Sequence, residues 1–390
     1  MKLLLRLIKR LVQLLLILTI GIVGWMYIDE PTLATRVIKL AVLGDSGPTH
    51  TVAASGYSEP SIINPTSGII DQEAIDQALE YGASTNSHSL LIYHQGHLVL
   101  EHYYPEYDAQ TYTATASMHK SVLAMLIGIA IEDGHIQSVS EPAANYISEW
   151  AGDERKEITI EQLLTQTSGI DFPTFSFNPT GGFFKFFLGD DITSVTLSEP
   201  LWATPGSQFD YNNVGPQTLG ILLERATGQK YSDYLEQNLW LKIGVDPATV
   251  QLDKEGGMAR TFCCLNATAR SWLKIGLLHL NKGKLNGEQI VPEEWMHATV
   301  VPGEHEANYG YLTWLGTEYK KQQRYNRKGS TSVYHSEPYL MKDLIYFDGF
   351  GGQRVYVIPS EGLVIVRTGD VSMDWDDALL PNTIFRGISQ

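Results

Sequence analysis

Ser117 and Lys120 combine a nucleophile and a base within one short motif, Ser117-Met118-His119-Lys120. Residues three apart share a face of a helix, so the lysine amine can reach the serine hydroxyl. A lysine kept neutral by burial can accept the serine proton, which makes the hydroxyl a nucleophile. The apolar run SVLAMLIGIAIEDG follows the motif and predicts a buried helix that holds the pair in place. The motif therefore predicts acyl transfer through a covalent intermediate on Ser117.

A second match to the same spacing, Ser271-Trp272-Leu273-Lys274, shows that the pattern alone is weak. A helix is predicted from about residue 267 to residue 280, and Ser271 is one position among many in it. Ser117 instead follows the polar, strand-like stretch TYTATA, at a junction between a strand and a helix. The helix N-terminus there favours negative charge that develops near the serine. Position thus selects Ser117 as the nucleophile.

Tyr211-Asn212-Asn213 supplies the further groups that a serine–lysine pair needs. The segment lies between the turn-rich loop PGSQFD and the apolar helix VGPQTLGILLERATG. A phenol beside an ammonium can ionise or relay protons, and an asparagine amide can orient the lysine and the substrate. Taken alone, the same residues fit a loop tyrosine and two turn asparagines. Together with Ser117 and Lys120, they predict a catalytic group that includes Tyr211 and Asn213.

Other hydrolytic and metal chemistries find less support. Gly44-Asp45-Ser46-Gly47 is similar to a serine-protease site, but that mechanism needs a histidine base, and no histidine precedes residue 50. The sequence has neither the Gly-x-Ser-x-Gly signature nor the zinc motif His-Glu-x-x-His. Cys263 and Cys264 are adjacent, a spacing that does not easily meet disulfide geometry and matches no zinc site. We therefore expect two small buried residues there, and no metal or organic cofactor.

The predicted secondary structure that positions these residues changes along the chain. A short helix is predicted over 69–81, followed by a hairpin across a Gln-Gly turn within 89–103. The period is helical from about residue 117 to about residue 300. The glycines that end these helices are Gly134, Gly228, Gly244 and Gly283. Strands return after Tyr309, in YGYLTWLG, QRVYVIP and LVIVRTG. This order predicts an α+β organisation with one sheet whose halves are far apart in sequence.

On these residues the chain resembles the penicillin-recognising serine hydrolases, which include class C β-lactamases, D-alanyl-D-alanine carboxypeptidases and related esterases. The stretches that carry the resemblance span about residues 85 to 370 and are SMHKSVLAMLIGIAIEDGHI, ITIEQLLTQTSGI, FDYNNVGPQTLGILLERATG, FCCLNATARSWLKIGLLHLNKGKLNG and GFGGQRVYVIPSEGLVIV. Within this superfamily the chain is most similar to the 6-aminohexanoate-dimer (nylon-oligomer) hydrolase branch. The resemblance implies a β-lactamase/penicillin-binding-protein-like fold, an antiparallel sheet flanked by helices with a helical lobe.

A third motif of that superfamily lies on a late strand and reads Lys or His, Thr or Ser, then Gly. Counted back from QRVYVIP, the matching triplet here is Phe347-Asp348-Gly349, whereas Arg367-Thr368-Gly369 ends the next strand. The resemblance implies that Gly349 lets the substrate backbone approach and that the Phe350 N–H joins the Ser117 N–H in an oxyanion hole. One such donor is typically worth ~2.7–4 kcal/mol.

The departure from the motif bears on the substrate. With Phe347 and Asp348 in place of Lys and Thr, a substrate carboxylate loses partners and meets a like charge. Efficient β-lactam turnover is therefore not expected, and a neutral ester or an amide with a cationic amine fits better. In the nylon-oligomer branch, a loop equivalent to the aromatic stretch between Thr167 and Leu197 contacts the amino end of the substrate. Asp190 or Asp191 is a candidate for that role, and a surface loop with an aromatic plug is the alternative.

The N-terminus carries a membrane signal. Its first ten residues hold no acid, and their basic residues are Lys2, Arg6, Lys9 and Arg10. The apolar segment Leu11–Ile28 that follows is long enough to span a bilayer, and Trp25 and Tyr27 suit its interface. The cations predict a cytoplasmic N-terminus, with the catalytic domain in the periplasm. A cleaved signal peptide, with Thr32-Leu33-Ala34 as its weak site, is the alternative.

Charge and composition set further limits on the partners. The chain has 390 residues and a formal net charge of −16, and after the basic tip the remaining 24 basic and 44 acidic residues carry −20. An acidic body argues against a nucleic-acid partner, whose phosphates need basic patches. The predicted parts are an anchor at 1–30, a linker rich in Gly, Pro, Ser and Thr at 31–65, and a β-lactamase-like hydrolase domain at 66–390.

The sequence thus predicts a serine hydrolase anchored in the inner membrane. Ser117 attacks the carbonyl of a small ester, an amide or a peptide, including linear amides of the 6-aminohexanoate type. Lys120 and Tyr211 serve as base and proton relay, and Asn213 orients the site. The runner-up is a D-alanyl-D-alanine carboxypeptidase or weak β-lactamase. From another class, a non-catalytic protein that binds peptidoglycan peptides fits the same fold.

Overall fold

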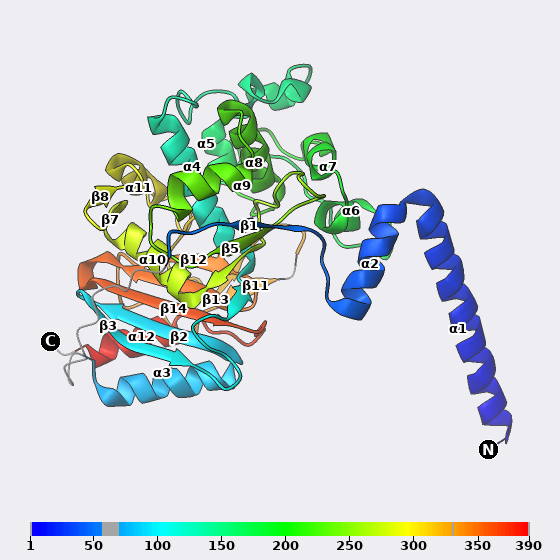
Figure 1. Ribbon diagram of the computed structural model, residues 1–390, viewed down its shortest axis with the longest axis horizontal. Helices are drawn as coiled ribbons and strands as arrows, with labels where there is room; N and C mark the ends of the chain where they lie inside the picture. The colour runs from blue at the N-terminus through cyan, green and yellow to red at the C-terminus, as the bar shows by residue number, and fades with distance from the viewer. Residues whose placement is uncertain (1, 57–69, 330, 389–390) are drawn as a thin grey trace.

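The computed structural model describes residues 2–56, 70–329 and 331–388. In Figure 1 a long N-terminal helix, α1 (Lys2–Asp29), projects from a body of sheet and helices. The stretch Leu4–Asp29 of this helix is long and apolar enough to cross a membrane. A second helix, α2 (Pro31–Leu43), follows directly and leads the chain to the body.

Much of the segment expected as a linker is folded. α2 has Pro31 in its first turn, where a helix N–H has no partner in any case, and ends at Gly44 with a φ of 70°. Strand β1 (Thr49–Val52) then pairs with a strand of the body. The turn-rich composition begins only at Gly44, whereas PTLATRVIKLAVL before it is mostly apolar. Residues 57–65 of the expected linker lie outside the described residues.

Within the described residues, the main sheet has six antiparallel strands in the order β3-β2-β14-β13-β12-β9. Their bounds are β2 (Ser87–His94), β3 (His97–Tyr103), β9 (Trp314–Leu315), β12 (Ile345–Gly349), β13 (Gln353–Ile358) and β14 (Leu363–Gly369). β2 and β3 form the predicted hairpin across Gln95 and Gly96, which both have positive φ. β14 pairs with β2, so the early hairpin and the late strands share one sheet, as predicted. YGYLTWLG pairs only at Trp314–Leu315, because the backbone turns at Leu312, whose φ is 50°.

Helices cover both faces of the main sheet. α3 (Gln72–Ser84) and α12 (Leu379–Gly387) pack on the face where Ile365 is buried, and α10 (Ala269–Leu280) packs on the face of Val364. Successive strand residues point to opposite faces, so burial on both sides explains the unbroken apolar run of β14. α3 continues past Gly82, where the sequence predicts its end. Gly82 has a packing role instead, because the absence of a side chain leaves room for the Tyr104 hydroxyl.

The long insert forms a helical lobe that lies above the main sheet in Figure 1. Its helices are α4 (His119–Glu132), α5 (Ile160–Leu164), α6 (Gly182–Leu188), α7 (Ile192–Ser198), α8 (Val214–Thr227), α9 (Tyr231–Leu235) and α11 (Glu293–Thr299). The glycines predicted to stop helices all have positive φ, and they are Gly134, Gly228, Gly244 and Gly283. The insert also contributes to a second sheet, which the sequence did not predict because its strands have only 3 or 4 residues. The strand order is β1-β5-β6-β4, with β4 (Tyr112–Ala114), β5 (Ala248–Gln251) and β6 (Leu265–Thr268).

Shorter elements complete the α+β architecture. Two small hairpins are β7 (Lys284–Leu285) with β8 (Glu288–Gln289), and β10 (Gln322–Arg324) with β11 (Ser332–Tyr334). The single-turn helices are η1 (Ala116–Met118), η2 (Ala143–Asn145), η3 (Ser148–Trp150), η4 (Glu154–Glu157), η5 (Glu236–Trp240) and η6 (Pro359–Glu361). Of these, η1 joins β4 to α4 and lies against β12, where the main sheet meets the helical lobe.

Candidate active site

Ser117 lies in the turn η1, directly before a helix that is buried on all sides. The residue before it, Ala116, has a φ of 48°, a left-handed conformation that residues with a side chain rarely adopt. α4 is buried from His119 to Ala130, so packing holds this strained turn in place. The serine thus lies at the predicted junction between strand and helix. By contrast, Ser271 and Lys274 of the second match are inside α10.

Lys120 is enclosed by three oxygen atoms. Its Nζ lies 2.7 Å from Ser117 Oγ, 2.8 Å from Asn213 Oδ1 and 2.9 Å from the Phe262 carbonyl oxygen. The lysine is only 1% exposed. Burial lowers the pKa of Lys120 to about 7, although the charge of Asp348 acts in the opposite direction. Near neutral pH a large share of the amine is therefore unprotonated and can accept the Ser117 proton.

The neighbouring residues Asn212 and Asn213 have different contacts. Asn212 Oδ1 accepts hydrogen bonds from the N–H groups of Val214 (2.9 Å) and Gly215 (3.1 Å), which stabilises the start of α8. Gln166 holds the Asn212 backbone through both its amide N–H and its carbonyl. Asn213 is therefore not needed as a cap, and its side chain accepts from Lys120 instead. This division explains why the lysine contact falls on Asn213.

Tyr211 lies in an aromatic pocket beside the lysine. The rings that surround it, with centroids between 5.3 Å and 5.9 Å away, belong to Tyr309, Trp314 and Tyr325. Lys120 Nζ lies 4.8 Å from the centroid of the Tyr211 ring. Burial raises the pKa of the Tyr211 phenol well above its usual range, Asp348 adds to this, and the Ser117 hydroxyl opposes it. At neutral pH the phenol stays protonated, so it suits a proton donor, and Lys120 suits the base.

Gly349 brings the last part of β12 against the nucleophile turn. A Cβ atom at this position would lie 2.2 Å from the Thr115 carbonyl oxygen and 2.6 Å from Gln353 Cβ. The glycine thus permits a close approach between two backbone segments of the protein, rather than only the approach of a substrate. As a result Phe350, the next residue, lies beside the turn that carries Ser117. The Phe350 side chain is exposed.

Comparison with known proteins identifies this arrangement. The sequence model described as Beta-lactamase matches residues 73–369. The chain belongs to the beta-lactamase family. The superfamily expected from the motifs is therefore confirmed, together with its fold.

Individual relatives within this beta-lactamase fold point to hydrolases. The 6-aminohexanoate-dimer hydrolase of Paenarthrobacter ureafaciens is 24% identical over 281 residues, 68% of this chain and 70% of that protein. A Bacillus anthracis structure assigned as a 6-aminohexanoate-dimer hydrolase covers 92% of this chain and 94% of its own, with a TM-score of 0.71 and 20% identity. A family VIII carboxylesterase covers 81% and 98%, with a TM-score of 0.60 and 15% identity. The chain is a member of a serine hydrolase family that contains amidases and esterases.

Asp348 does not present a free charge to the site of this beta-lactamase-family chain. Its carboxylate lies 2.5 Å from Arg354 Nη1 and accepts a hydrogen bond from the Tyr325 hydroxyl, with its side chain only 2% exposed. Arg354 also binds the Asp377 carboxylate through Nε and Nη2. Arg354 places one positive charge between the carboxylates of Asp348 and Asp377, so the expected repulsion of a substrate carboxylate by Asp348 stays a prediction. The effect of Asp348 within the site is to raise the pKa of Lys120.

His119, the residue before the lysine, holds the backbone that Lys120 contacts. Its Nδ1 lies 2.5 Å from the Cys263 carbonyl oxygen, which can only accept, so Nδ1 carries the proton and Nε2 accepts from the Tyr231 hydroxyl at 2.7 Å. Burial lowers the pKa of His119 to about 4, so the ring is neutral at physiological pH. The sequence reasoning overlooked this positioning residue, although it lies inside the Ser-x-x-Lys motif.

Cys263 and Cys264 differ from the expectation of two small buried thiols. Their sulfur atoms are joined in a disulfide, and both residues are only half-buried. The backbone at Cys264 has a φ of 73°, so the chain turns at this point. The carbonyl of Cys264 accepts from the Gln251 N–H, and that of Cys263 accepts from His119. The pair thus belongs to the segment that contacts Lys120 through Phe262.

The two acidic residues proposed to bind a substrate amine have other contacts. Asp191 caps α7, accepting from the backbone N–H and the hydroxyl of Ser194. Asp190 lines a hollow against α2, together with Arg36 and Lys254. Neither carboxylate contacts the Ser117 group in the described parts of the chain, and the expected role in substrate binding stays a prediction. Arg260 explains the placement, because it binds the carbonyls of Phe186 and Gly189 and so fixes this end of the loop.

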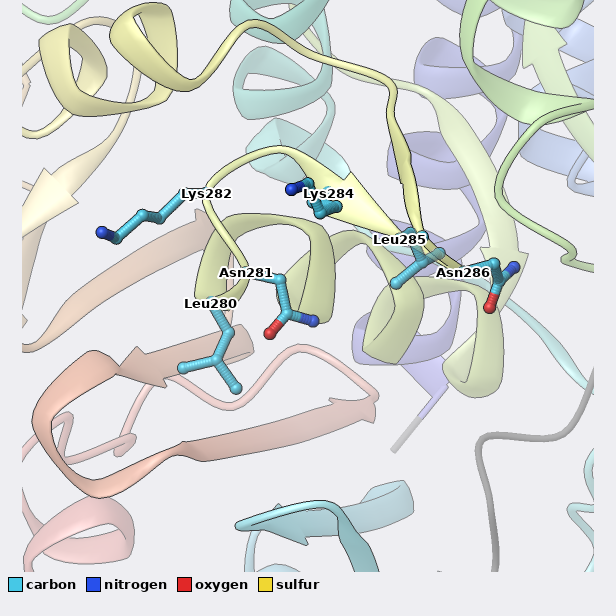
Figure 2. A pocket seen from close by; sticks show the side chains of 7 residues that line it. Leu280, Asn281, Lys282, Lys284, Leu285 and Asn286 are labelled. Atoms are coloured by element: carbon cyan, nitrogen blue, oxygen red, sulfur yellow. The ribbon is translucent and has the colours of Figure 1, made fainter.

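Figure 2 shows a separate hollow of about 420 Å³ between the end of α10 and the β7–β8 hairpin. Its lining side chains are Leu280, Asn281, Lys282, Lys284, Leu285 and Asn286. It combines amides and lysines but no nucleophile with a base, so it is not the site of acyl transfer. Among the described residues there is also no group of three or more metal-binding side chains.

Proposed function

We propose that this protein is a serine hydrolase that cleaves esters or amides through an acyl-enzyme on Ser117. The observation that carries the proposal is the contact of 2.7 Å between Lys120 Nζ and Ser117 Oγ in a buried, nearly neutral lysine site. Lys120 accepts the hydroxyl proton while Ser117 Oγ attacks the carbonyl carbon of the substrate. The N–H groups of Ser117 and Phe350 stabilise the oxyanion that forms.

The second half of the reaction uses the same groups in reverse. The leaving alcohol or amine takes a proton from Lys120 or Tyr211 as the acyl-enzyme forms. A water molecule then gives a proton to this pair and attacks the acyl carbon, which releases the acid and restores the Ser117 hydroxyl. The protonated phenol favours Tyr211 as the donor to the leaving group.

The residues at the third motif support a substrate that has no carboxylate for them to bind. Phe347 is buried beside His279, and Asp348 is paired with Arg354, so neither offers the donor that a β-lactam carboxylate needs. Small esters and linear amides of the 6-aminohexanoate type are the substrate classes that fit this arrangement.

The test uses a fluorophosphonate probe and a panel of p-nitrophenyl esters, linear amides, nitrocefin and D-alanyl-D-alanine peptides. Ser117→Ala should lose both the covalent adduct and turnover. Ser271→Ala is the matched control, because it removes the serine of the second Ser-x-x-Lys match and should keep both. No adduct on the unmodified protein would favour the non-catalytic binding protein. Efficient nitrocefin or D-alanyl-D-alanine turnover would instead favour the β-lactamase or carboxypeptidase alternative.

The same proposal places the enzyme on a membrane. The basic tip, the apolar helix α1 and its terminal Trp25 and Tyr27 support an anchor with the body outside the cytoplasm. Mass spectrometry of the membrane fraction should detect the peptide that contains α1. Detection of the body only in soluble form, beginning after Ala34, would support a cleaved signal peptide instead.

A further inference from the structure

The loop before α6 exposes aromatic side chains. Phe177 is 95% exposed and Phe175 is 58% exposed. These two rings pack on each other with centroids 5.5 Å apart, and Phe175 also contacts Phe183 (5.4 Å) and Phe184 (5.9 Å) of α6. We call these four residues the aromatic cluster. Single exposed apolar residues are common, whereas a contiguous exposed group marks an interaction surface.

The aromatic cluster lies beside the end of the apolar helix α1. Lys185 of α6 is ion-paired with Glu30, the residue directly after α1, with Nζ and Oε1 2.5 Å apart. Arg36 of α2 donates to the carbonyl oxygens of Leu188 (2.9 Å) and Gly189 (2.7 Å), at the other end of α6. Figure 1 shows α6 next to α2, on the side of the body from which α1 projects. α6 is thus fixed at the level where α1 ends.

If α1 spans the bilayer, the end of α1 and the neighbouring α6 lie at the bilayer surface. Trp25 and Tyr27, at the end of α1, are exposed, as expected of side chains at the boundary between lipid and water. The last turn of α2 exposes two more apolar side chains, Val42 and Leu43. These two residues lie at the far end of α2, whereas the aromatic cluster lies beside the end of α1, where aromatic groups match the surface of a protein that rests on lipid.

From the contact of α6 with the end of α1 we propose that the aromatic cluster docks on the outer surface of the bilayer in which α1 is anchored. The proposal rests on the proposed anchoring by α1. Because the body is strongly acidic, we expect it to bind lipid by insertion of apolar side chains and not by attraction to anionic lipid. Lys185 and Arg36 would then lie at the level of the lipid phosphates. A membrane of zwitterionic lipid is therefore sufficient.

Docking would also orient the candidate active site. The aromatic cluster continues inward through Phe186 and Phe187, whose rings contact Phe262 with centroids 4.8 Å and 5.4 Å apart. The Phe262 carbonyl binds Lys120. A row of packed aromatic rings, buried at Phe186 and Phe262, thus connects the aromatic cluster to the backbone that Lys120 contacts.

The test measures the depth of one side chain in the full chain, reconstituted in phosphatidylcholine vesicles. Phe177→Cys is labelled with an environment-sensitive fluorophore, and quenching is compared with and without nitroxide-bearing lipids. Val301→Cys is the matched control. Val301 is an apolar residue with 60% exposure just after α11, which Figure 1 places on the far side of the body from α6. The chain without an added cysteine is the blank, and circular dichroism checks the fold of each variant.

We expect strong quenching of the label at position 177 and none at position 301. A chain that floats with the vesicles but shows equal, weak quenching at both positions overturns docking and leaves anchoring intact. A chain that does not float with the vesicles overturns both. Neither readout depends on hydrolysis, so the outcome is independent of the proposed catalytic activity.

Discussion

Replacing Asn213 by aspartate tests whether Lys120 is the catalytic base. The change keeps the size of the side chain and places a carboxylate where Asn213 Oδ1 now lies, 2.8 Å from Lys120 Nζ. A negative charge at such a distance stabilises the ammonium form, typically by about 1–3 pKa units. We therefore expect the pKa of Lys120 to rise above its present value of about 7.

The size of the effect follows from the share of neutral lysine. With a pKa of about 7, about half of the amine is neutral at pH 7, whereas a rise of about two units leaves about 1%. Thus kcat/KM for Asn213→Asp should fall about 50-fold at pH 7 and recover as the pH approaches about 9. Asn213→Ala removes an acceptor without adding charge, so the acidic limb of its pH profile, where activity rises with pH, should move to lower pH or stay in place.

The assay is the pH profile of kcat/KM with a soluble p-nitrophenyl ester, from about pH 5 to about pH 10. Opposite shifts of the limb in the two variants identify Lys120 as the titrating base. Equal losses in both variants at every pH, with no shift of the limb, would refute this assignment. In that case Asn213 would act only by holding the geometry of the site.

Three other predictions concern the relay, the oxyanion side and acid stability. Tyr211→Phe keeps the ring and removes the proton donor, so kcat in steady-state ester hydrolysis should fall ~10²–10⁴-fold with little change in KM. Gly349→Ala places a Cβ 2.2 Å from the Thr115 carbonyl oxygen, so the rate of fluorophosphonate labelling should drop sharply, and an unchanged rate would contradict the close approach described. Burial lowers the pKa of His119 from 6.5 to about 4, so its contribution to stability is complete above about pH 6.5 and is lost as the pH falls through about 4. Urea unfolding should show this loss, up to ~3 kcal/mol, and a shallower pH dependence in His119→Gln.

Local signals made the contact between Ser117 and Lys120 and the main strands predictable. Ser117 and Lys120 are three residues apart, so the contact between them follows from helix geometry. The hairpin of β2 and β3 carries its own turn at Gln95 and Gly96, and β14 is an unbroken apolar run. In these cases the residues that determine the structure are close together in the sequence.

The partners that come from distant segments were not predictable. Asp348 is ion-paired with Arg354 of β13, which also binds Asp377 near the C-terminus, and no spacing rule connects these three residues. The third oxygen around Lys120 is the carbonyl of Phe262, and a backbone carbonyl leaves no signature in the residue type. Asn213 was among the predicted residues, but the physical reason for its contact with Lys120 was not, because it depends on Asn212, which caps α8.

The order of strands in the main sheet has a consequence for the newly made chain. β2 is synthesised early, but its neighbour in the sheet, β14, is synthesised only after the whole helical insert. β12, which ends at Gly349, comes only shortly before β14 in the sequence. Pairing between such distant segments is slow and must wait for the later one. Ser117 therefore leaves the ribosome long before Gly349 and the strands beside it. We therefore expect the proposed hydrolytic activity to arise only once β12 to β14 have joined the sheet.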